Sequence, residues 1–328
     1  MNLKVLAEAG PTIGLGHFTR SLALVQMVRS LVTPVFFGLD ESLVIDTLDA
    51  HNISFQRLDS LDDFLNHFTP EDIVLIDGYN YDSTFQAAIR EKCYRLLLID
   101  DKHDKRYSAD YIINPAPGIS SEDYDVSGNC NFLLGPNYAL LRPAFLQLEK
   151  SEKATIPTKA LVCFGGADPD NLSHAVVSLL LTFTELSDIH LVVGPAYNYY
   201  SSLELLLNDN RLKVSRSLKE TEMADALKAA HFAIVPSSGI LYECLGVGTP
   251  AISGYYIDNQ SLMYKGWLDL GAIIGVENFD MELLKCRVED ILNESINFQD
   301  LLQNIPVDGK SPERFRNIFE EIIESYED

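Results

Sequence analysis

The strongest constraint on the fold is an alternation of short β-branched runs with longer amphipathic stretches, which occurs twice along the 328-residue chain. Such runs predict buried strands, the stretches between them predict helices, and this order favours a parallel sheet with helices on both faces. In the first half the predicted strands are Leu3–Glu8, Val35–Gly38, Ile73–Ile76, Leu96–Ile99 and Tyr111–Asn114. The predicted helices there are Gly16–Leu31, Glu41–Ala50, Leu58–Phe68 and Ser83–Glu91.

The alternation restarts after a polar segment, Ser151–Lys159, which we interpret as a linker. A chain of this length usually forms more than one core, so we expect one Rossmann-like domain over residues 1–150 and another over 151–328. The ligand should bind at the carboxyl ends of both sheets, in a cleft between the domains. The predicted strands of this half are Ala160–Phe164, His190–Val193, Leu212–Ser215, Phe232–Pro236 and Ala251–Tyr255. The predicted helices are Ser173–Glu185, Tyr200–Leu207, Glu220–Ala230, two starting at Gly239 and Gln260, and Ser311–Tyr326.

Charge and cysteine spacing exclude several classes of protein. The chain has 48 acidic and 25 basic residues, and this net charge of −23 argues against a nucleic-acid or anionic-membrane partner. A phosphorylated ligand must then be held by local donors such as helix N-termini. No segment is apolar over the ~18 residues that a membrane span needs, and no secretory leader is visible, so the cytoplasm is expected. The five cysteines are scattered without a CxxC pair. We therefore expect no metal site and no cofactor, and the oligomeric state is left open.

A glycine loop follows the first predicted strand and opens the first helix. Gly14 and Gly16 allow a ligand to approach the backbone, where the helix start offers free N–H groups. Thr19 replaces the third glycine of the dinucleotide-binding pattern, so we reject an NAD site. The helix dipole opposes protonation of His17 and predicts a neutral imidazole that can act as a base. Arg20 lies on the same helix face, where it can orient a substrate group.

Two polar loops follow later strands of the first half. The segment Asp77–Tyr81 places Tyr79 at the mouth of a parallel strand, although an ordinary Asp-Gly turn with packing tyrosines is an equal alternative. The segment Asp100–Asp104 contains three aspartates and a histidine. Adjacent residues of one short loop seldom converge on one ion, so we do not favour a metal site there.

In the second half, two loops are candidates for ligand contacts. Gly165 and Gly166, with Asp168 close by, suit a phosphate or a sugar that approaches backbone amides, with a plain turn and helix cap as the alternative. Asn259 and Gln260 stand at a helix start, where amide side chains can read sugar hydroxyls or merely cap the helix.

A third loop of this half has the composition of a diphosphate site. Ser237, Ser238 and Gly239 put two hydroxyls and a glycine at a helix start. Glu243, one turn into that helix, can take both hydroxyls of a ribose. The alternative is that Ser-Ser-Gly is simply a good N-cap. Together these loops make the second half the predicted nucleotide-binding half, while the first half carries the candidate base.

These segments resemble one known family in the same order over nearly the whole chain. The family is the PseG/SpsG-type UDP-sugar hydrolases of pseudaminic acid biosynthesis, related in fold to the MurG glycosyltransferases. The resemblance rests on GxGHxxR at Gly14–Arg20, the turn Ile99–Asp101, LLGPxYALLRPxF at Leu133–Phe145, FGGxDPxN at Phe164–Asn171, SSGxxYE at Ser237–Glu243 and DNQ at Asp258–Gln260.

The resemblance implies a GT-B fold with UDP in the C-terminal domain, and in many such proteins the last helix, here 311–326, packs back on the N-terminal domain. It also implies metal-independent hydrolysis of UDP-2,4-diacetamido-2,4,6-trideoxy-β-L-altropyranose, with His17 activating the water. Tyr79 and Asn259 would contact the sugar. The chain departs from the family at its first strand, where Ala7, Glu8 and Gly10 replace an arginine-plus-aspartate start, so the exact sugar is left open. The residues implied for the pyrophosphate and ribose are Ser237, Ser238, Gly239 and Glu243.

Three functions are compatible with these residues. In the favoured one, water attacks the anomeric carbon. In the second, a glycosyltransferase, the same cleft admits a sugar or lipid acceptor. The absence of a basic cluster in the first half argues against a membrane-linked acceptor. The third is a nucleotide-sugar-binding protein without catalysis, which the presence of His17, Arg20 and Asn259 argues against.

Overall fold

The computed structural model describes residues 1–10, 14–40, 42–146 and 157–327 and divides into two compact units. Unit 1 comprises Met1–Arg142 and Lys310–Asp328, and unit 2 comprises Pro143–Gly309. The boundary therefore lies at Arg142 rather than at residue 150, and the C-terminal segment belongs with the N-terminal domain. Most of the predicted linker, residues 151–156, lies outside the described residues.

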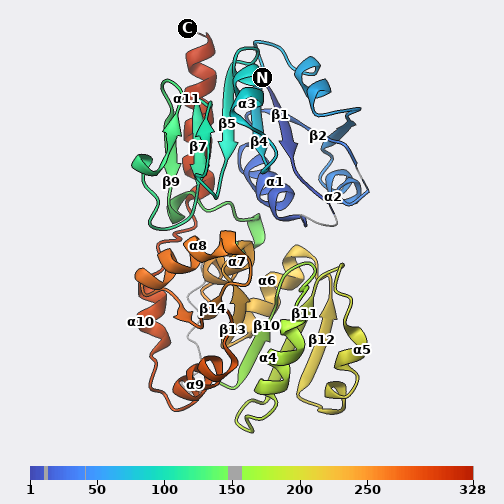
Figure 1. Ribbon diagram of the computed structural model, residues 1–328, viewed down its shortest axis with the longest axis vertical. Helices are drawn as coiled ribbons and strands as arrows, with labels where there is room; N and C mark the ends of the chain where they lie inside the picture. The colour runs from blue at the N-terminus through green and yellow to red at the C-terminus, as the bar shows by residue number, and fades with distance from the viewer. Residues whose placement is uncertain (11–13, 41, 147–156, 328) are drawn as a thin grey trace. The chain divides into compact units, whose positions relative to one another are not determined.

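Unit 1 is built on a seven-stranded parallel sheet in the order β3-β2-β1-β4-β5-β7-β9 (Figure 1). Both faces of this sheet are buried. Along β1, Leu3 and Val5 enter one apolar cluster, whereas Leu6 enters a second cluster on the opposite face. This alternation follows from the two-residue period of a strand. The strands are β1 Asn2–Ala7, β2 Thr33–Gly38, β3 Ser54–Arg57, β4 Ile73–Asp77, β5 Arg95–Ile99, β7 Tyr111–Asn114 and β9 Asn131–Leu134, with β6 Arg106–Tyr107 and β8 Asp125–Val126 pairing separately.

Helices from both ends of the chain cover one face of this sheet. The helix α11 (Ser311–Glu327) packs against α1 (Gly16–Val28), and Figure 1 shows it (red) beside the strands of unit 1. Phe315 and Phe319 of α11 are fully buried in the same cluster as Leu3 and Val5 of β1. This burial is the physical reason that the last helix belongs to unit 1. The remaining helices of the unit are α2 Ile45–Ala50 and α3 Ser83–Arg90.

Unit 2 repeats the same architecture around a six-stranded parallel sheet in the order β12-β11-β10-β13-β14-β15. Its core joins both the strands and the helices that cover them. The strands are β10 Lys159–Val162, β11 Asp188–Val193, β12 Leu212–Arg216, β13 Phe232–Pro236, β14 Ala251–Gly254 and β15 Ile274–Gly275. The helices are α4 Leu172–Leu180, α5 Tyr200–Leu203, α6 Glu220–Ala229, α7 Gly239–Gly246, α8 Asp258–Asp269, α9 Met281–Leu292 and α10 Phe298–Gln303.

Several predicted helices are shorter than expected, and the one near Tyr200–Leu207 ends at Leu203. The helix expected over Leu58–Phe68 is wrong, because only a 3₁₀ segment, Asp62–Asn66, forms there. Ser60 Oγ accepts the backbone N–H of Asp63 at 3.2 Å, which is the geometry of an N-cap, so the helical turn starts only after Ser60. The helix expected to reach Glu185 ends at Leu180. Among the described residues, no helix is both long and apolar enough to cross a bilayer.

Candidate active site

The candidate active site of unit 1 lies where three neighbouring strands end. Strand β1 leads into the loop before α1, β4 ends at Asp77, and β5 ends at Ile99 just before Asp101. These strands are parallel and adjacent, so their carboxyl ends lie at one edge of the sheet. His17 is the second residue of α1 and therefore sits at the helix N-terminus above this edge.

His17 and Asp77 form a buried pair at this edge. His17 Nδ1 lies 2.7 Å from Asp77 Oδ1, and the two residues are 5% and 0% exposed. An ionised carboxylate only accepts hydrogen bonds, so the contact with Asp77 assigns the proton to Nδ1. Arg20 Nη2 also lies 3.0 Å from Nδ1, but it donates to Asp77 Oδ1 at the shorter distance of 2.6 Å. This tautomer leaves Nε2 as the imidazole atom that can accept a proton. The pair thus has the arrangement of an oriented general base.

Arg20 and Ser21 hold the Asp77 carboxylate in place. Arg20 donates to both of its oxygens, from Nε at 2.7 Å and from Nη2 at 2.6 Å, and Ser21 Oγ donates at 3.1 Å. Burial by itself raises the pKa of the Asp77 carboxyl, but Arg20 and His17 outweigh it and lower this pKa below its usual range. Burial likewise lowers the pKa of Arg20, but Asp77 and Asp101 outweigh it and raise this pKa well above normal. Both groups are therefore charged at neutral pH.

Asp101 and Tyr79 extend the same network. Asp101 Oδ2 accepts Arg20 Nη1 at 2.9 Å and the Tyr79 hydroxyl at 3.1 Å. The Tyr79 ring meets the His17 ring edge to face at 4.6 Å between centroids. Lys102 Nζ lies 3.9 Å from the centre of the Tyr79 ring. Tyr79 therefore packs directly against the imidazole and limits how it can rotate.

Glu8 fixes the loop that carries Tyr79. Its carboxylate accepts the backbone N–H of Tyr79 at 2.9 Å and that of Asn80 at 3.1 Å. A side chain on Gly78 would collide with Glu8, because a Cβ there would lie 2.5 Å from Glu8 Cδ. The glycine of the Asp-Gly turn is thus required by the close approach of Glu8. Glu8, one of the residues that depart from the resembled family, is thus a structural part of this site.

Asp100, next to Asp101, is already saturated with donors. The hydroxyls of Tyr107 and Tyr124 donate to its two oxygens at 2.9 and 3.1 Å, and the backbone N–H of His103 donates at 2.8 Å. Burial raises the pKa of the Asp100 carboxyl. Its role is to shape the loop Asp100–Asp104.

The first candidate loop of unit 2 is partly used for internal contacts. Gly165 has φ of 78°, which favours glycine, and Gly166 accepts the backbone N–H of Ala196 at 3.0 Å. Asp168 is 3% exposed and accepts the N–H groups of Leu172 and Ser173 at 2.9 and 2.8 Å. Its carboxylate therefore caps α4, and this function occupies both of its oxygens.

The loop Ser237–Gly239 of unit 2 has one buried serine and an accessible helix start. Ser237 is fully buried, and its hydroxyl pairs with that of Ser253 at 2.9 Å. Ser238 is the N-cap residue of α7, Gly239 begins the helix and is exposed, and Glu243 is half-buried one turn later. The helix start is thus formed by Ser238 and Gly239, whereas the Ser237 hydroxyl is engaged in the interior.

The last candidate residues stand in the first turn of α8, which starts at Asp258 rather than at Gln260. Gln260 is 7% exposed, and its side-chain oxygen accepts the backbone N–H of Tyr256 at 3.2 Å. Asn259 is half-buried. His17, Arg20 and Tyr79 come together in unit 1, whereas Asn259 belongs to unit 2. In the glycine loop, Gly14 pairs with Gly10, and Gly16 is the first residue of α1.

Sequence reasoning missed several residues of the unit 1 network, among them Asp77 as the partner of His17 and Glu8 as the support of Tyr79. Both pairs bridge distant parts of the chain, at sequence separations of 60 for His17 and Asp77 and 71 for Glu8 and Tyr79. A usable signal is that acidic residues end or follow two adjacent apolar strands, β1 and β4. Ligands of parallel α/β sheets bind at the carboxyl ends of the strands, so acidic groups at this edge are candidates for the site.

Comparison with known proteins adds distant relatives. No protein-family model matches the chain. An uncharacterized protein of Methanocaldococcus jannaschii is 24% identical over 319 residues, covering 89% of this chain, which spans only 65% of that relative's length. The spore coat polysaccharide biosynthesis protein SpsG of Bacillus subtilis is 23% identical over 291 residues, covering 84% of this chain and 83% of SpsG.

Solved structures match over almost the full length. MurG of Acinetobacter baumannii has a TM-score of 0.65 at 14% identity, covering 99% of this chain and 100% of MurG. The calicheamicin glycosyltransferase CalG4 has a TM-score of 0.63 at 13% identity, covering 99% of both chains. MnaA of S. aureus, solved with UDP, has a TM-score of 0.60 at 13% identity, covering 99% of this chain and 97% of MnaA. The chain therefore has the GT-B fold, with two Rossmann-like domains.

Proposed function

We propose that this protein is an enzyme that uses a UDP-sugar as donor and transfers its glycosyl group to an acceptor hydroxyl in polysaccharide biosynthesis. The observation that carries the proposal is the buried His17–Asp77 pair, with 2.7 Å between Nδ1 and Oδ1. The relatives support the substrate class, because SpsG is a spore coat polysaccharide biosynthesis protein, MurG and CalG4 match along the whole chain, and MnaA was solved with UDP.

In the proposed reaction, His17 Nε2 accepts the proton of the attacking hydroxyl while its oxygen forms a bond to the anomeric carbon. The bond between that carbon and the UDP oxygen breaks, and UDP leaves with the electron pair. The imidazolium that forms is stabilised by the Asp77 carboxylate, whose position Arg20 fixes. The proton then returns to solvent or to the departing phosphate. The step needs only donor, acceptor and base.

The donor is proposed to bind unit 2 at the start of α7 and at the glycine loop after β10. The N-terminus of α7 at Ser238 and Gly239 offers backbone donors for the diphosphate, and Gly165 and Gly166 offer a second close backbone approach. Glu243 would bind the ribose. Asn259 would contact the sugar. The side chains of Ser237, Asp168 and Gln260 are left out of this set, because each is engaged within unit 2.

Hydrolysis is a second candidate function, in which water takes the place of the acceptor. It is favoured by the GxGHxxR, FGGxDPxN and SSGxxYE segments, which resemble the UDP-sugar hydrolases of pseudaminic acid biosynthesis. His17 would activate the water in the same way. The substrate to test is UDP-2,4-diacetamido-2,4,6-trideoxy-β-L-altropyranose.

Proton NMR of the purified protein separates these functions. The protein is incubated with UDP-N-acetylglucosamine or the diacetamido sugar nucleotide, with and without n-octyl β-D-glucoside as a probe acceptor. UDP released only with the acceptor supports transfer, and UDP with free sugar in its absence supports hydrolysis. A UDP-sugar that is isomerised instead would contradict both.

The matched variants are His17→Ala and His67→Ala. Loss of a general base costs roughly 10²- to 10⁴-fold in turnover, while UDP binding should persist in His17→Ala. His67 is a partly exposed histidine of unit 1 paired with Asp63, so its replacement should leave turnover unchanged. Unchanged turnover in His17→Ala would remove His17 from the mechanism.

A further inference from the structure

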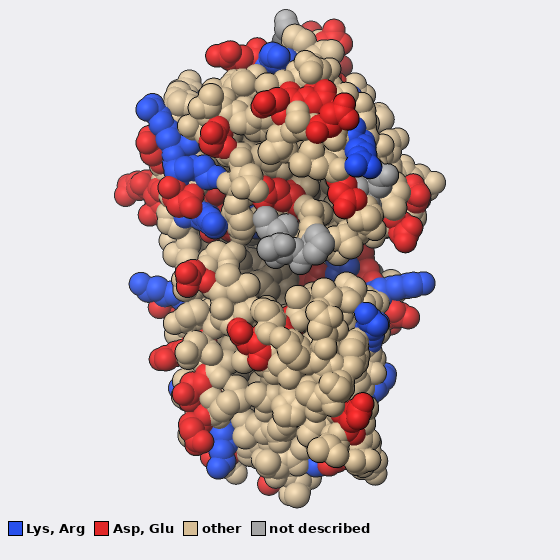
Figure 2. Space-filling model, turned by 45° about the vertical axis from the view of Figure 1, so that its right-hand side comes forward, with Lys and Arg blue, Asp and Glu red and all other residues tan. Residues whose placement is uncertain are grey.

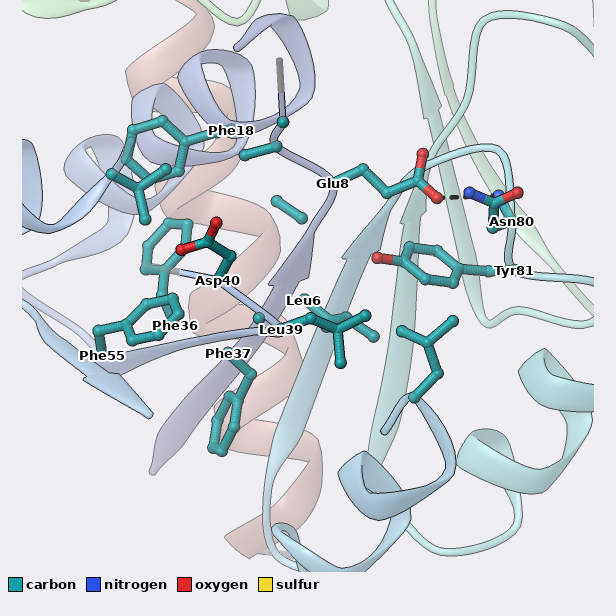
Figure 3. A pocket seen from close by; sticks show the side chains of 16 residues that line it. Leu6, Glu8, Phe18, Phe36, Phe37, Leu39, Asp40, Phe55, Asn80 and Tyr81 are labelled. Atoms are coloured by element: carbon teal, nitrogen blue, oxygen red, sulfur yellow. Dashed lines mark hydrogen bonds between the residues drawn. The ribbon is translucent and has the colours of Figure 1, made fainter. Parts of the chain in front are cut away.

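A cavity of about 500 Å³ opens in unit 1 at the carboxyl ends of β1 and β2, and the proposed reaction has not used it. In Figure 3 the phenylalanine rings gather on one side, and Glu8 extends toward Asn80 on the other. Its size falls in the range of about 300–1,000 Å³ that is usual for small-molecule sites. We call this cavity the β1–β2 pocket. It is lined by Leu6–Gly10, Phe18, Phe36–Asp40, Val44, Phe55, Leu61, Asn80 and Tyr81.

The body of the β1–β2 pocket is apolar. Phe18 and Phe36 are 4% and 2% exposed, and their rings stack edge to face at 5.5 Å. They form a preordered wall that no ligand has to rearrange. Leu39 lines the same pocket yet is 48% exposed. An apolar group that enters the pocket would cover Leu39 and bury it.

The charged lining residues of the described part of the chain are both acidic, Glu8 and Asp40. Asp40 accepts the backbone N–H of Ser42 at 2.9 Å, and this bond lowers the pKa of its carboxyl. Both oxygens of Glu8 accept backbone N–H groups. Two carboxylates without a lysine or arginine in this lining repel phosphates and carboxylates. The occupant is therefore not an anion, and the apolar body of the pocket disfavours a charged group of either sign.

The pocket adjoins the candidate active site. Phe18 follows His17 in α1, and Glu8 lines the pocket while it holds the loop of Tyr79, whose ring touches that of His17. A group seated in the pocket would thus lie beside the residues that position the base.

We propose that the β1–β2 pocket binds an uncharged apolar group of the substrate. Its place in the reaction rests on the proposed function, in which the group belongs either to the acceptor or to the transferred sugar. Phosphate-bearing parts of the substrate bind elsewhere.

Methyl NMR of the full-length protein tests this directly. Leucine and valine methyls are labelled, and the protein is titrated with 2-naphthol and with 2-naphthoate, which share a ring system but differ in charge. We expect 2-naphthol to shift the methyls of Leu39 and Val44 and to bind at least about tenfold more tightly than 2-naphthoate at low salt. Equal binding of the two, or no shift at Leu39 and Val44, would overturn the proposal.

Three variants sharpen the test. Leu39→Glu adds a charge at the pocket and should weaken 2-naphthol binding at least about tenfold. Leu205→Glu makes the same change at an 83% exposed leucine of unit 2 and should leave it unchanged. Asp40→Asn removes one of the two charges and should bring the affinity of 2-naphthoate closer to that of 2-naphthol. Equal effects of Leu39→Glu and Leu205→Glu would also overturn the proposal.

A further titration identifies the source of the group. If UDP-N-acetylglucosamine alone shifts the Leu39 methyls, the pocket takes part of the donor sugar. If 2-naphthol still binds in the presence of saturating UDP-N-acetylglucosamine, the pocket takes part of the acceptor. Both results support the binding of an apolar group in the β1–β2 pocket. Because these are binding measurements, the proposal stands or falls separately from the proposed function, whose test is the release of UDP.

Discussion

Asp77 connects three other residues of the candidate site through its carboxylate. His17, Arg20 and Ser21 all contact its two oxygens, and it is fully buried. In Asp77→Asn the amide can no longer balance the charge of Arg20 or enforce the Nδ1–H tautomer of His17. We expect turnover to fall roughly 10²- to 10⁴-fold and the free energy of unfolding to fall by about 3–5 kcal/mol.

The measurements for Asp77→Asn are UDP release and urea unfolding. Asp125→Asn is the matched control, because Asp125 pairs with Arg106 at 3.9 Å on the surface, with both side chains more than 60% exposed. Such a pair contributes at most about 1 kcal/mol. Equal effects of the two variants would contradict the role given to Asp77.

Asp77 also makes stability depend on pH. Its pKa in the folded protein lies below the ordinary value of 3.8, because Arg20 and His17 outweigh the effect of burial. The stabilisation is therefore fully present above about pH 4 and is lost as the pH falls through the lower folded pKa. We expect the unfolding free energy of the wild type to drop more steeply below pH 4 than that of Asp77→Asn. Parallel slopes in urea titrations would contradict this.

Glu8 acts through the backbone of Tyr79 and Asn80. Glu8→Ala leaves two N–H groups without their acceptor, whereas Glu8→Gln keeps one carbonyl oxygen. We expect turnover to fall by about tenfold in Glu8→Ala and less in Glu8→Gln, with faster amide hydrogen exchange at Tyr79 and Asn80 in the same order. Glu122→Ala, an exposed glutamate of unit 1, should change neither quantity. A loss of turnover without faster exchange would rule out this positioning role.

What the sequence can reveal at this scale depends on distance along the chain. His17, Arg20 and Tyr79 stand in loops after predicted strands, so local pattern was enough to select them. The Glu8–Asn80 contact joins residues 72 apart, and no local pattern indicates it. Ser237 and Asp168 show the opposite problem. They lie in loops whose composition suits a ligand, but their side chains form hydrogen bonds within unit 2.

At the scale of elements, α11 shows that the end of the chain stabilises its beginning. Phe315 is fully buried in the cluster of β1 and α1, and its ring meets Tyr138 at 5.9 Å. Phe315→Ala should lower the free energy of unfolding of unit 1 by about 3–5 kcal/mol, because it leaves a cavity. Hydrogen exchange should speed up in β1 and β4 but not in β10 and β13.

The control for Phe315→Ala lies on the same helix. Glu320 is exposed, so Glu320→Ala should leave exchange in β1 and β4 as it is in the wild type. If Phe315→Ala sped up exchange in β10 rather than β1, the assignment of α11 to unit 1 would be wrong.

The elements that sequence predicted well are those with buried, continuous apolar runs. Strands β7 and β13 have the expected bounds, and both are largely or wholly buried. Strand β3 went unpredicted because it is an edge strand whose Ser54, Gln56 and Arg57 are exposed, which removes the apolar signal. The division of the chain into two units could not be predicted from the sequence either. It depends on where Phe315 and Phe319 pack and not on the composition of the linker.

At the scale of the whole molecule, the net charge of −23 opposes the proposed substrate. On the face that Figure 2 shows, acidic side chains are present on both units. A UDP-sugar is itself an anion, so it is repelled at long range and held only by local donors such as the start of α7. Local contacts are screened little by salt, while the long-range repulsion is screened strongly.

Salt should therefore improve the binding of the donor, contrary to the usual weakening of a charged complex. Between about 10 and 200 mM salt the Debye length falls from roughly 30 Å to below 10 Å, and we expect the KM for the UDP-sugar to fall by about two- to fivefold. Calorimetric titration with UDP measures a dissociation constant without turnover, and this constant should also fall as salt is added. Uridine is the matched control, because it carries no phosphate and its affinity should not change. A dissociation constant for UDP that rises with salt would mean that a local cluster of cations, rather than backbone donors, holds the diphosphate.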